Sequence, residues 1–352
     1  MSSDLKKIYI HVGLPKTGST FLRNNFFAEL NNVALFTAVK KNDSNPISGM
    51  MFELGQLQMK YGRKIEEAEF PDPEYYKKKI NQYFQSIADE NILISWSSFL
   101  CSMGGARDDF KSIIPVSNFL KRVFSEARII MIIRRQDTYI ESNYSQVLKK
   151  SSYAGDFDSF VRINCLNDND QRELFINPSL CNYLHFYNTY CTHFGRNNIL
   201  IIPFEKLVYD QKNFIEDIVQ FMQVKSVAID KPPENLGYSG QSMKLSRIYN
   251  KFRKYSKHKA ERILDKPIQK YLDTKSTTIK VKFIQIVIGK LKQFQIRAYL
   301  EKWDKFLKKL GLYSKPSLLT KTLRDKIMNT CSASNKELSD KLHLQLTKYG
   351  YY

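Results

Sequence analysis

The chain has 352 residues, with 55 Lys and Arg against 35 Asp and Glu, a net charge of +20. No apolar run reaches the roughly 20 residues that a membrane-spanning helix needs, and no charged and apolar targeting segment precedes Ile8. The five cysteines are scattered and lack the spacing of metal ligands. We therefore expect a cytoplasmic protein without a bound metal, with peripheral contact at the inner membrane face as a further option.

The apolar segments alternate between strand-like and helix-like patterns along the chain. Continuous apolar runs of strand length predict strands that are buried on both faces of a parallel sheet. The alternation predicts an α/β fold of three layers (α/β/α), with a mainly parallel central sheet, a P-loop-like phosphate-binding loop and a basic helical C-terminal region. The expected strands are residues 8–12, 91–94, 127–133 and 198–203.

A chain of this length can form one large α/β domain with an appendage. We expect residues 1–255 to form the α/β core and residues 256–330 to form a basic, mostly helical appendage. Residues 331–352 are expected to be a C-terminal segment that packs back on the core.

The first expected strand runs into a loop with two glycines, Gly13 and Gly18, and a helix follows. Loop N–H groups and a helix N-terminus can cradle a phosphate. The glycine spacing is that of the loop G-x-x-x-x-G-K-[ST], but Ser19 stands where that loop has its lysine. A P-loop kinase would need that lysine and a carboxylate for Mg²⁺. The cation lies inside the loop instead, at Lys16, which predicts a different phosphate ligand.

A second anion site is expected after the strand at residues 127–133. Ligands of open parallel sheets bind where the strands end, so Arg134 is placed to meet an anion. A helix opens at Gln136, and Ser142 follows Arg134 by eight positions on that helix. The guanidinium and the hydroxyl together favour a terminal phosphate. Arg135 is a second choice for the same role.

A helix, a strand and a further helix are expected between residues 180 and 224. The aromatic and apolar residues from Leu180 repeat at helical spacing, and Phe194-Gly195 is a typical helix end. The strand at 198–203 is followed by Phe204-Glu205-Lys206-Leu207, Asp210 and a helix with an apolar stripe. We interpret this region as scaffold and Glu205 as a local hydrogen-bonding anchor rather than a catalyst.

The loop Leu14-Pro15-Lys16-Thr17-Gly18-Ser19-Thr20 resembles the 5′-phosphosulfate loop of sulfotransferases that use 3′-phosphoadenosine 5′-phosphosulfate (PAPS). Arg134 and Ser142 resemble the clamp that these enzymes place on the 3′-phosphate. The resemblance implies a PAPS-dependent sulfotransferase of the bacterial type that releases 3′,5′-adenosine bisphosphate (PAP) and needs no metal. It implies donor contacts from Lys16, Thr17, Gly18, Ser19, Thr20, Phe21, Arg134 and Ser142.

The resemblance also implies the catalytic roles. Lys16 would neutralise the charge that grows on the leaving phosphate. A base must take the acceptor proton, and His11 is the histidine nearest the loop in sequence; Glu53, Asp108 and Asp109 are alternatives. Many glycan-modifying relatives carry a Glu after the strand at 91–94, where this chain has Ser95-Trp96-Ser97-Ser98.

The acceptor is expected to be a glycan, a polysaccharide or a glycolipid. The alternatives are a small alcohol or phenol as acceptor, or a non-catalytic protein of the same fold that binds the nucleotide and a polyanion. Residues 241–320 hold 21 Lys and Arg against 5 Asp and Glu, so most of the chain's net charge of +20 lies in this region. Such basic, partly apolar helices can meet an anionic membrane surface or an acidic polymer, or can pack on the core with lysines outward. Nucleic acid is the weaker expectation, because no nucleic-acid module accompanies the charge.

Overall fold

The computed structural model describes residues 6–37, 45–101, 110–150, 153–165, 182–227, 229, 238–261, 293–314 and 316–352. The contacts divide the chain into two compact units. The first, which we call the sheet unit, comprises Met1–Ile140, Ile163–Glu234 and Lys321–Tyr352. The second, the helical unit, comprises Glu141–Arg162 and Asn235–Thr320.

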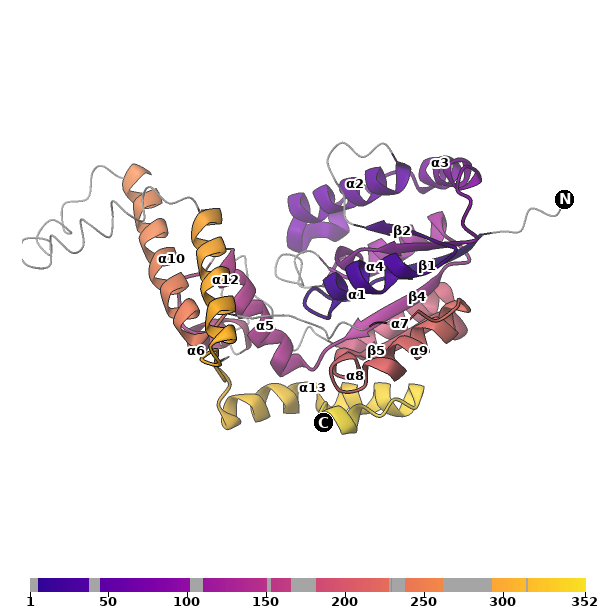
Figure 1. Ribbon diagram of the computed structural model, residues 1–352. Coiled ribbons are helices and arrows are strands. Elements are labelled where there is room, and N and C mark those ends of the chain that lie inside the picture. The colour runs from indigo at the N-terminus through magenta and orange to yellow at the C-terminus, as the bar shows by residue number, and fades with distance from the viewer. Residues whose placement is uncertain are drawn as a thin grey trace, which may run out of the picture. The chain divides into compact units, whose positions relative to one another are not determined.

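The sheet unit is built on five parallel strands in the order β2-β3-β1-β4-β5. Four of them confirm the strands expected from apolar runs, whereas β2 was not anticipated. Figure 1 shows this sheet with helices packed around it. The strands are β1 (Lys7–His11), β2 (Val33–Thr37), β3 (Asn91–Ser95), β4 (Arg128–Ile133) and β5 (Ile199–Pro203).

Both faces of the sheet are covered by apolar cores, because successive side chains of a strand point to opposite faces. In β4, Ile129, Met131 and Ile133 belong to one core, while Ile130 and Ile132 belong to the other. A strand that is buried on both faces reads as an unbroken apolar run, which is the pattern that revealed β4 in the sequence.

Two sets of helices supply these cores and complete the three layers. Residues of α2 (Pro46–Tyr61), α3 (Pro73–Gln85), α4 (Ile113–Val123) and α7 (Tyr183–Phe194) join the core on one face. Residues of α1 (Ser19–Asn25) and α9 (Gln211–Met222) join the core on the other face. The expected α/β fold with a mainly parallel sheet is thereby confirmed.

Local signals explain where several of these helices begin and end. Each of α2 and α3 starts at a proline that follows a capping side chain. The Asn45 side chain accepts a hydrogen bond from the Ser48 N–H, and the Asp72 carboxylate accepts one from the Glu74 N–H. Helix α7 ends at Gly195, whose φ of 83° lies in the left-handed region, as the sequence predicted.

The strand order creates a switch point between β1 and β4, which are neighbours. The chain leaves β1 toward β2 on one side of the sheet and leaves β4 toward β5 on the other. Ligands of open α/β sheets bind in the crevice outside the strand ends at such a point. The loop after β1 and the arginines after β4 lie at this position.

The C-terminal segment of the sheet unit consists of α13 (Lys321–Leu342) and a short 3₁₀ helix, Leu346–Tyr349. Its Asn335 amide exchanges hydrogen bonds with Gln136, at 3.0 and 3.1 Å, and donates one to the Tyr351 carbonyl. These contacts tie the segment to the start of α5 (Gln136–Lys149), directly after β4.

The helical unit contains most of α5 and of α6 (Phe157–Cys165), with α10 (Gly240–Glu261) and α12 (Gln293–Lys309). The buried Asp304 carboxylate of α12 accepts hydrogen bonds from the Ser239 N–H and the Ser242 hydroxyl at the start of α10. The Ser239 hydroxyl caps α10 by accepting a hydrogen bond from the Ser242 N–H at 3.2 Å. The Asp304 carboxylate holds both serines and so joins the two helices.

Part of the expected appendage at 256–330 lies outside the described residues, so the predicted division into three parts stays a prediction. Among the helices that the structure describes, none is both long and apolar enough to cross a membrane.

Candidate active site

The loop after β1 folds tightly on itself. The Thr17 hydroxyl is buried and donates a hydrogen bond of 2.5 Å to the Leu14 carbonyl. Lys16 has a φ of 73°, a left-handed conformation that costs about 1–2 kcal/mol for a residue with a Cβ. Strained backbone of this kind often marks a functional site. The rest of the loop therefore holds the Lys16 backbone in a conformation that a lysine residue by itself disfavours.

Gly18 ends the loop and precedes α1, with a φ of 82°. A Cβ at this position would lie 2.9 Å from Leu207 and 3.2 Å from the Phe204 ring. Glycine is therefore required both for the backbone conformation and for the close approach of the segment after β5. This packing against Phe204 and Leu207 was not anticipated from the sequence, because it joins residues far apart in the chain.

The first turn of α1 carries the three residues that follow Gly18. Ser19 is buried, and its Oγ has no hydrogen-bond partner among the described residues. Thr20 is exposed, whereas the Phe21 side chain is buried in a core cluster. A donor contact from Phe21 would therefore come from its backbone N–H. The N–H groups at the start of a helix lack acceptors within the helix.

His11, the last residue of β1, is fully buried beneath this loop. Its Nδ1 lies 2.8 Å from the Ser95 hydroxyl, and its Nε2 has no partner in the described part of the chain. A Cβ at Gly13 would lie 2.8 Å from that Nε2. Burial, with a smaller contribution from the Arg23 charge, lowers the pKa of His11 to about 3. The imidazole is therefore neutral at physiological pH.

Arg134, directly after β4, reaches across the switch point to the loop. Its Nη1 donates a hydrogen bond of 2.7 Å to the Lys16 carbonyl, and its Nε donates one to the Thr138 hydroxyl. The guanidinium lies 4.7 Å from the centre of the Phe204 ring, within the range of a cation–π contact. The structure thus joins the loop to Arg134, two features that the sequence placed at separate phosphates.

Arg135, the second choice for the 3′-phosphate, contacts protein groups instead. It binds the fully buried Asp137 through two nitrogens, at 2.7 and 3.0 Å, and donates to the Tyr349 carbonyl. Arg324 of α13 also contacts Asp137, at 3.0 Å. Because these groups occupy both edges of the guanidinium, we assign Arg135 a structural role.

Glu205 is a hydrogen-bonding anchor, as predicted, but its partners are distant in the chain rather than local. Its carboxylate accepts hydrogen bonds from the Arg135 N–H at 3.1 Å and from the Tyr351 hydroxyl at 2.7 Å. Burial raises the pKa of Glu205, although these hydrogen bonds oppose the shift. The contact with Tyr351 could not be found by sequence spacing, since 146 positions separate the two residues.

The remaining predicted residues lie elsewhere. Ser142 is half-buried in α5, on the part of the helix that belongs to the helical unit, and its pairing with Arg134 stays a prediction. Glu53 is exposed on α2, and Asp108 and Asp109 lie outside the described residues. Within the described ranges, no group of three or more His, Cys, Asp or Glu residues could hold a metal ion.

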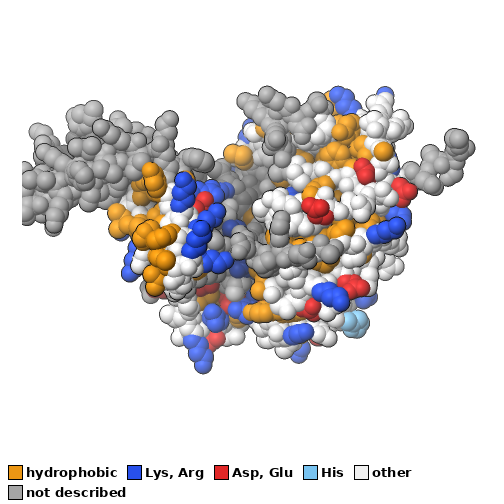
Figure 2. Space-filling model, viewed as in Figure 1, with side chains coloured by type: hydrophobic (Ala, Val, Ile, Leu, Met, Phe, Trp, Pro, Cys, Tyr) orange, Lys and Arg blue, Asp and Glu red, His pale blue; other side chains and the backbone are white. Residues whose placement is uncertain are grey.

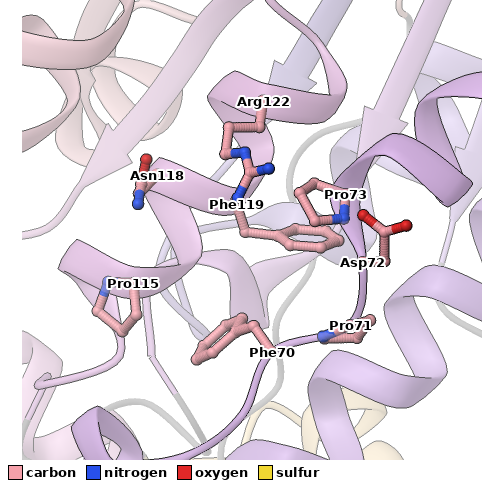
Figure 3. Close-up of a pocket in the computed structure, with 8 residues that line it drawn as sticks. All are labelled: Phe70, Pro71, Asp72, Pro73, Pro115, Asn118, Phe119 and Arg122. Carbon is pink, nitrogen blue, oxygen red and sulfur yellow. The ribbon is translucent and has the colours of Figure 1, made fainter.

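A pocket of about 290 Å³ lies beside α3 and α4 (Figure 3). Proline and phenylalanine rings form much of its wall, and none of the predicted site residues lines it. The rings of Phe70 and Phe119 lie 6.2 Å apart, and Asp72 caps α3. We assign this pocket to packing between helices. It is lined by Phe70, Pro71, Asp72, Pro73, Pro115, Asn118, Phe119 and Arg122.

Comparison with known proteins gives a family and several similar structures. The model of the sulfotransferase family matches residues 9–227. A sulfotransferase from Alicyclobacillus acidocaldarius is 14% identical, with a TM-score of 0.45, and the match covers 66% of this chain and 86% of that chain. A sulfotransferase domain from the curacin biosynthetic pathway is 13% identical, with a TM-score of 0.35 and coverages of 63% and 75%.

A third similar structure is the sulfotransferase domain of the Synechococcus PCC 7002 olefin synthase. It is 18% identical, with a TM-score of 0.30, and the match covers 64% of this chain and 77% of that chain. The comparison with curated proteins gives no significant match.

Proposed function

Because the chain belongs to the sulfotransferase family, we propose that it transfers a sulfuryl group from PAPS to a hydroxyl or amine of an acceptor. Family membership supports sulfuryl transfer, and the donor and the acceptor are parts of the proposal. The observation that carries the choice of donor is the buried Ser19 hydroxyl without a partner among the described residues, at the end of a loop that holds Lys16.

The loop fits the phosphosulfate end of this donor. A buried hydroxyl without a hydrogen-bond partner costs about 1–3 kcal/mol, and a phosphate oxygen would accept the hydrogen of Ser19 Oγ. The N–H groups of the first turn of α1 lie next to it along the chain, and Lys16 adds a positive charge. These groups together favour a dianionic oxygen cluster at the switch point.

The reaction breaks the bond between sulfur and the phosphate oxygen of the donor and forms one from sulfur to the acceptor oxygen or nitrogen. PAPS supplies the sulfuryl group when it is bound. Lys16 would neutralise the negative charge that grows on the leaving phosphate. Charged and hydrogen-bonding groups that are fixed in position before the reaction lower its activation barrier more than groups that must reorient. The acceptor proton passes to a base.

We propose that His11 positions the loop. A fully buried imidazole with a pKa of about 3 is a poor acceptor for the proton of a substrate, because the best general bases have a pKa near the working pH. Its contact with Ser95 and its place against Gly13 support a role in holding the loop above the sheet.

Arg134 would hold the second phosphate end of the nucleotide together with Ser142. Its guanidinium is already oriented by Lys16, Thr138 and Phe204, and orientation in advance reduces the entropy lost on binding. Ser142 would supply a hydroxyl donor to the same phosphate, as the resemblance implies.

For the acceptor we favour a glycan, a polysaccharide or a glycolipid over a small alcohol or phenol. The support is the charge of the chain, which is +20 with most of the excess in residues 241–320. Basic surfaces raise the local concentration of acidic polymers.

The test is incubation of the full chain with radiolabelled PAPS and separate panels of glycans, glycolipids and phenols, with calorimetric titration of PAP in parallel. We expect PAP to bind with a dissociation constant of about micromolar order and label to enter at least one glycan or glycolipid. Failure to bind PAP would contradict the donor assignment.

A non-catalytic nucleotide-binding protein is the second candidate. It is favoured by one observation, the sequence Ser95-Trp96-Ser97-Ser98, which places no carboxylate after β3 and pairs Ser95 with His11. Tight PAP binding without labelled product from any panel would support this alternative over the enzyme.

A further inference from the structure

Helix α12 carries a row of apolar side chains on its outer surface. Tyr299, Trp303 and Phe306 recur at intervals of four and three residues, so they lie on one face of the helix. Leu310 directly follows the last helical residue, and its N–H donates a hydrogen bond of 3.2 Å to the Phe306 carbonyl. The four side chains are 43–66% exposed. We call this row the α12 stripe. Soluble proteins seldom expose contiguous apolar surface without an interaction that uses it.

The stripe is distinct from the surface by which α12 packs. Leu300, Asp304 and Leu307 are buried, and the hydrogen bonds of Asp304 fix that side against the start of α10. The helix is therefore already packed along one face, and the stripe adjoins that face without being part of it. Leu245 and Ile248 of α10 are also about half-exposed, which adds aliphatic surface to the same unit.

Lysines flank the stripe on the side away from the packed face. Lys302, Lys305 and Lys309 are exposed on α12. Helical geometry places Lys302 and Lys309 next to Phe306 and Lys305 beside these two lysines. Figure 2 shows apolar side chains and Lys and Arg side chains lying next to one another over the α10 and α12 part of the molecule. Aromatic and aliphatic side chains on one face with lysines beside them are typical of helices that lie in the interface of a bilayer.

We propose that the α12 stripe docks on an anionic lipid surface. The four apolar side chains would enter the boundary between headgroups and acyl chains, and the lysines would extend their ammonium groups to lipid phosphates and carboxylates. The helix would lie in the plane of the surface, since no described helix can span it. This inference goes beyond sulfuryl transfer and does not depend on the donor.

Charge and side-chain type favour a lipid surface over other partners. A second copy of this chain would bring Lys302, Lys305 and Lys309 against like charges, in a molecule of net charge +20, which disfavours self-association. A sugar chain would stack on the rings but would gain little from Leu310, whereas acyl chains gain from both. An anionic bilayer meets the apolar row and the lysines together.

The experiment is flotation of the full chain with vesicles of phosphatidylcholine, with or without about one-third phosphatidylserine. We expect binding to the anionic vesicles alone, and a loss of binding when salt is raised to about 0.5 M. Absence of binding to anionic vesicles would overturn the proposal, and equal binding to both vesicle types would overturn the role of charge.

The variant W303S/F306S should weaken vesicle binding at least about tenfold, because it removes two rings from the stripe. The control is I114S/M59S, which changes two apolar side chains of the sheet unit with similar exposed fractions and should leave binding unchanged. An equal loss in both variants, or none in W303S/F306S, would place the lipid contact elsewhere. The variant K302Q/K305Q/K309Q should lose the preference for anionic vesicles.

Trp303 provides a direct readout, since the chain has two tryptophans. In a W96F background its emission should shift to shorter wavelength with anionic vesicles. A shift that depends on protein concentration without vesicles, accompanied by a dimer in sedimentation, would overturn the lipid assignment in favour of a second copy.

Discussion

The two units use their apolar and polar side chains in opposite ways. In the sheet unit, β4 buries apolar side chains on both faces, and polar groups gather where the strands end, as Arg134 and Lys16 do. In the helical unit, a buried carboxylate, Asp304, joins two helices while the rings of α12 lie outside. The sheet unit thus places its polar groups at the ends of buried strands, whereas the helical unit places apolar rings at its surface.

The largest expected effect concerns the site of the sheet unit. The change Lys16→Ala should reduce sulfuryl transfer by about 100-fold or more, because a preplaced charge stabilises the leaving phosphate. PAP affinity should fall by less than about tenfold, since the loop N–H groups and Arg134 remain. Turnover of labelled PAPS and calorimetry with PAP measure the two effects.

The control for this change is Lys78→Ala, which alters an exposed lysine of α3 and should leave transfer and affinity unchanged. Transfer by the Lys16 variant within about threefold of the parent would show that another group neutralises the phosphate.

Substitutions of Arg134 and Arg135 should have different effects, the first on PAP binding and the second on folding stability. The change Arg134→Ala should lower PAP affinity about tenfold or more, through loss of a charged hydrogen-bond donor. The change Arg135→Ala should leave PAP affinity within about threefold but lower the free energy of unfolding by about 2–3 kcal/mol, because the buried Asp137 loses one of its two arginines.

Calorimetry with PAP and urea unfolding of both variants measure this contrast. A loss of PAP affinity in Arg135→Ala with normal stability would reassign the phosphate to Arg135.

The buried imidazole under the loop predicts a dependence of stability on pH. The pKa of His11 is about 3 in the folded protein and 6.5 is the reference value, so unfolding takes up a proton between these values. Folding stability should therefore fall as the pH drops below 6.5, by about 2 kcal/mol at pH 5. The variant His11→Asn should lose this contribution and keep a polar atom toward Ser95.

Urea unfolding of parent and variant at about pH 7.5 and about pH 5 gives the change in unfolding free energy with pH for each protein. The contributions of the other titrating groups cancel when the two changes are subtracted. An equal loss of stability in both proteins would show that His11 is not buried in its neutral form.

The smallest effect should stay within the helical unit. The change Asp304→Ala should destabilise this unit by about 1–2 kcal/mol, since the start of α10 loses two hydrogen-bond acceptors. Hydrogen exchange of the α10 amides should increase, while PAP affinity should change by less than about threefold, since Ser142 on α5 is the one residue of this unit that we propose at the donor. Asp325→Ala, at an exposed position of α13, is the matched control. A loss of PAP affinity in Asp304→Ala would show that the two units are coupled.

Local patterns were sufficient for much of the fold. Apolar runs, helical spacing and glycine predicted four of the five strands, the end of α7 at Gly195, and the order α7, β5, α9. The short helix α8 (Phe204–Tyr209) between β5 and α9 was not predicted. The strand β2 was missed although residues 33–36 form an unbroken apolar run, which is the same local signal that revealed the other strands. The strand order could not be predicted, since it depends on contacts between distant segments.

The site was also predicted only in part, because local signals can be read from the sequence and contacts between distant residues cannot. The sequence alone placed the loop after one strand and Arg134 after another, because glycines, hydroxyls and charges at strand ends are local signals. The tertiary structure decided that Arg134 contacts the Lys16 carbonyl, that Arg135 binds Asp137, and that His11 is buried. It also decided which apolar residues of α12 stay exposed to solvent. Helical spacing shows that the helix has apolar faces, but only packing selects the face that is buried.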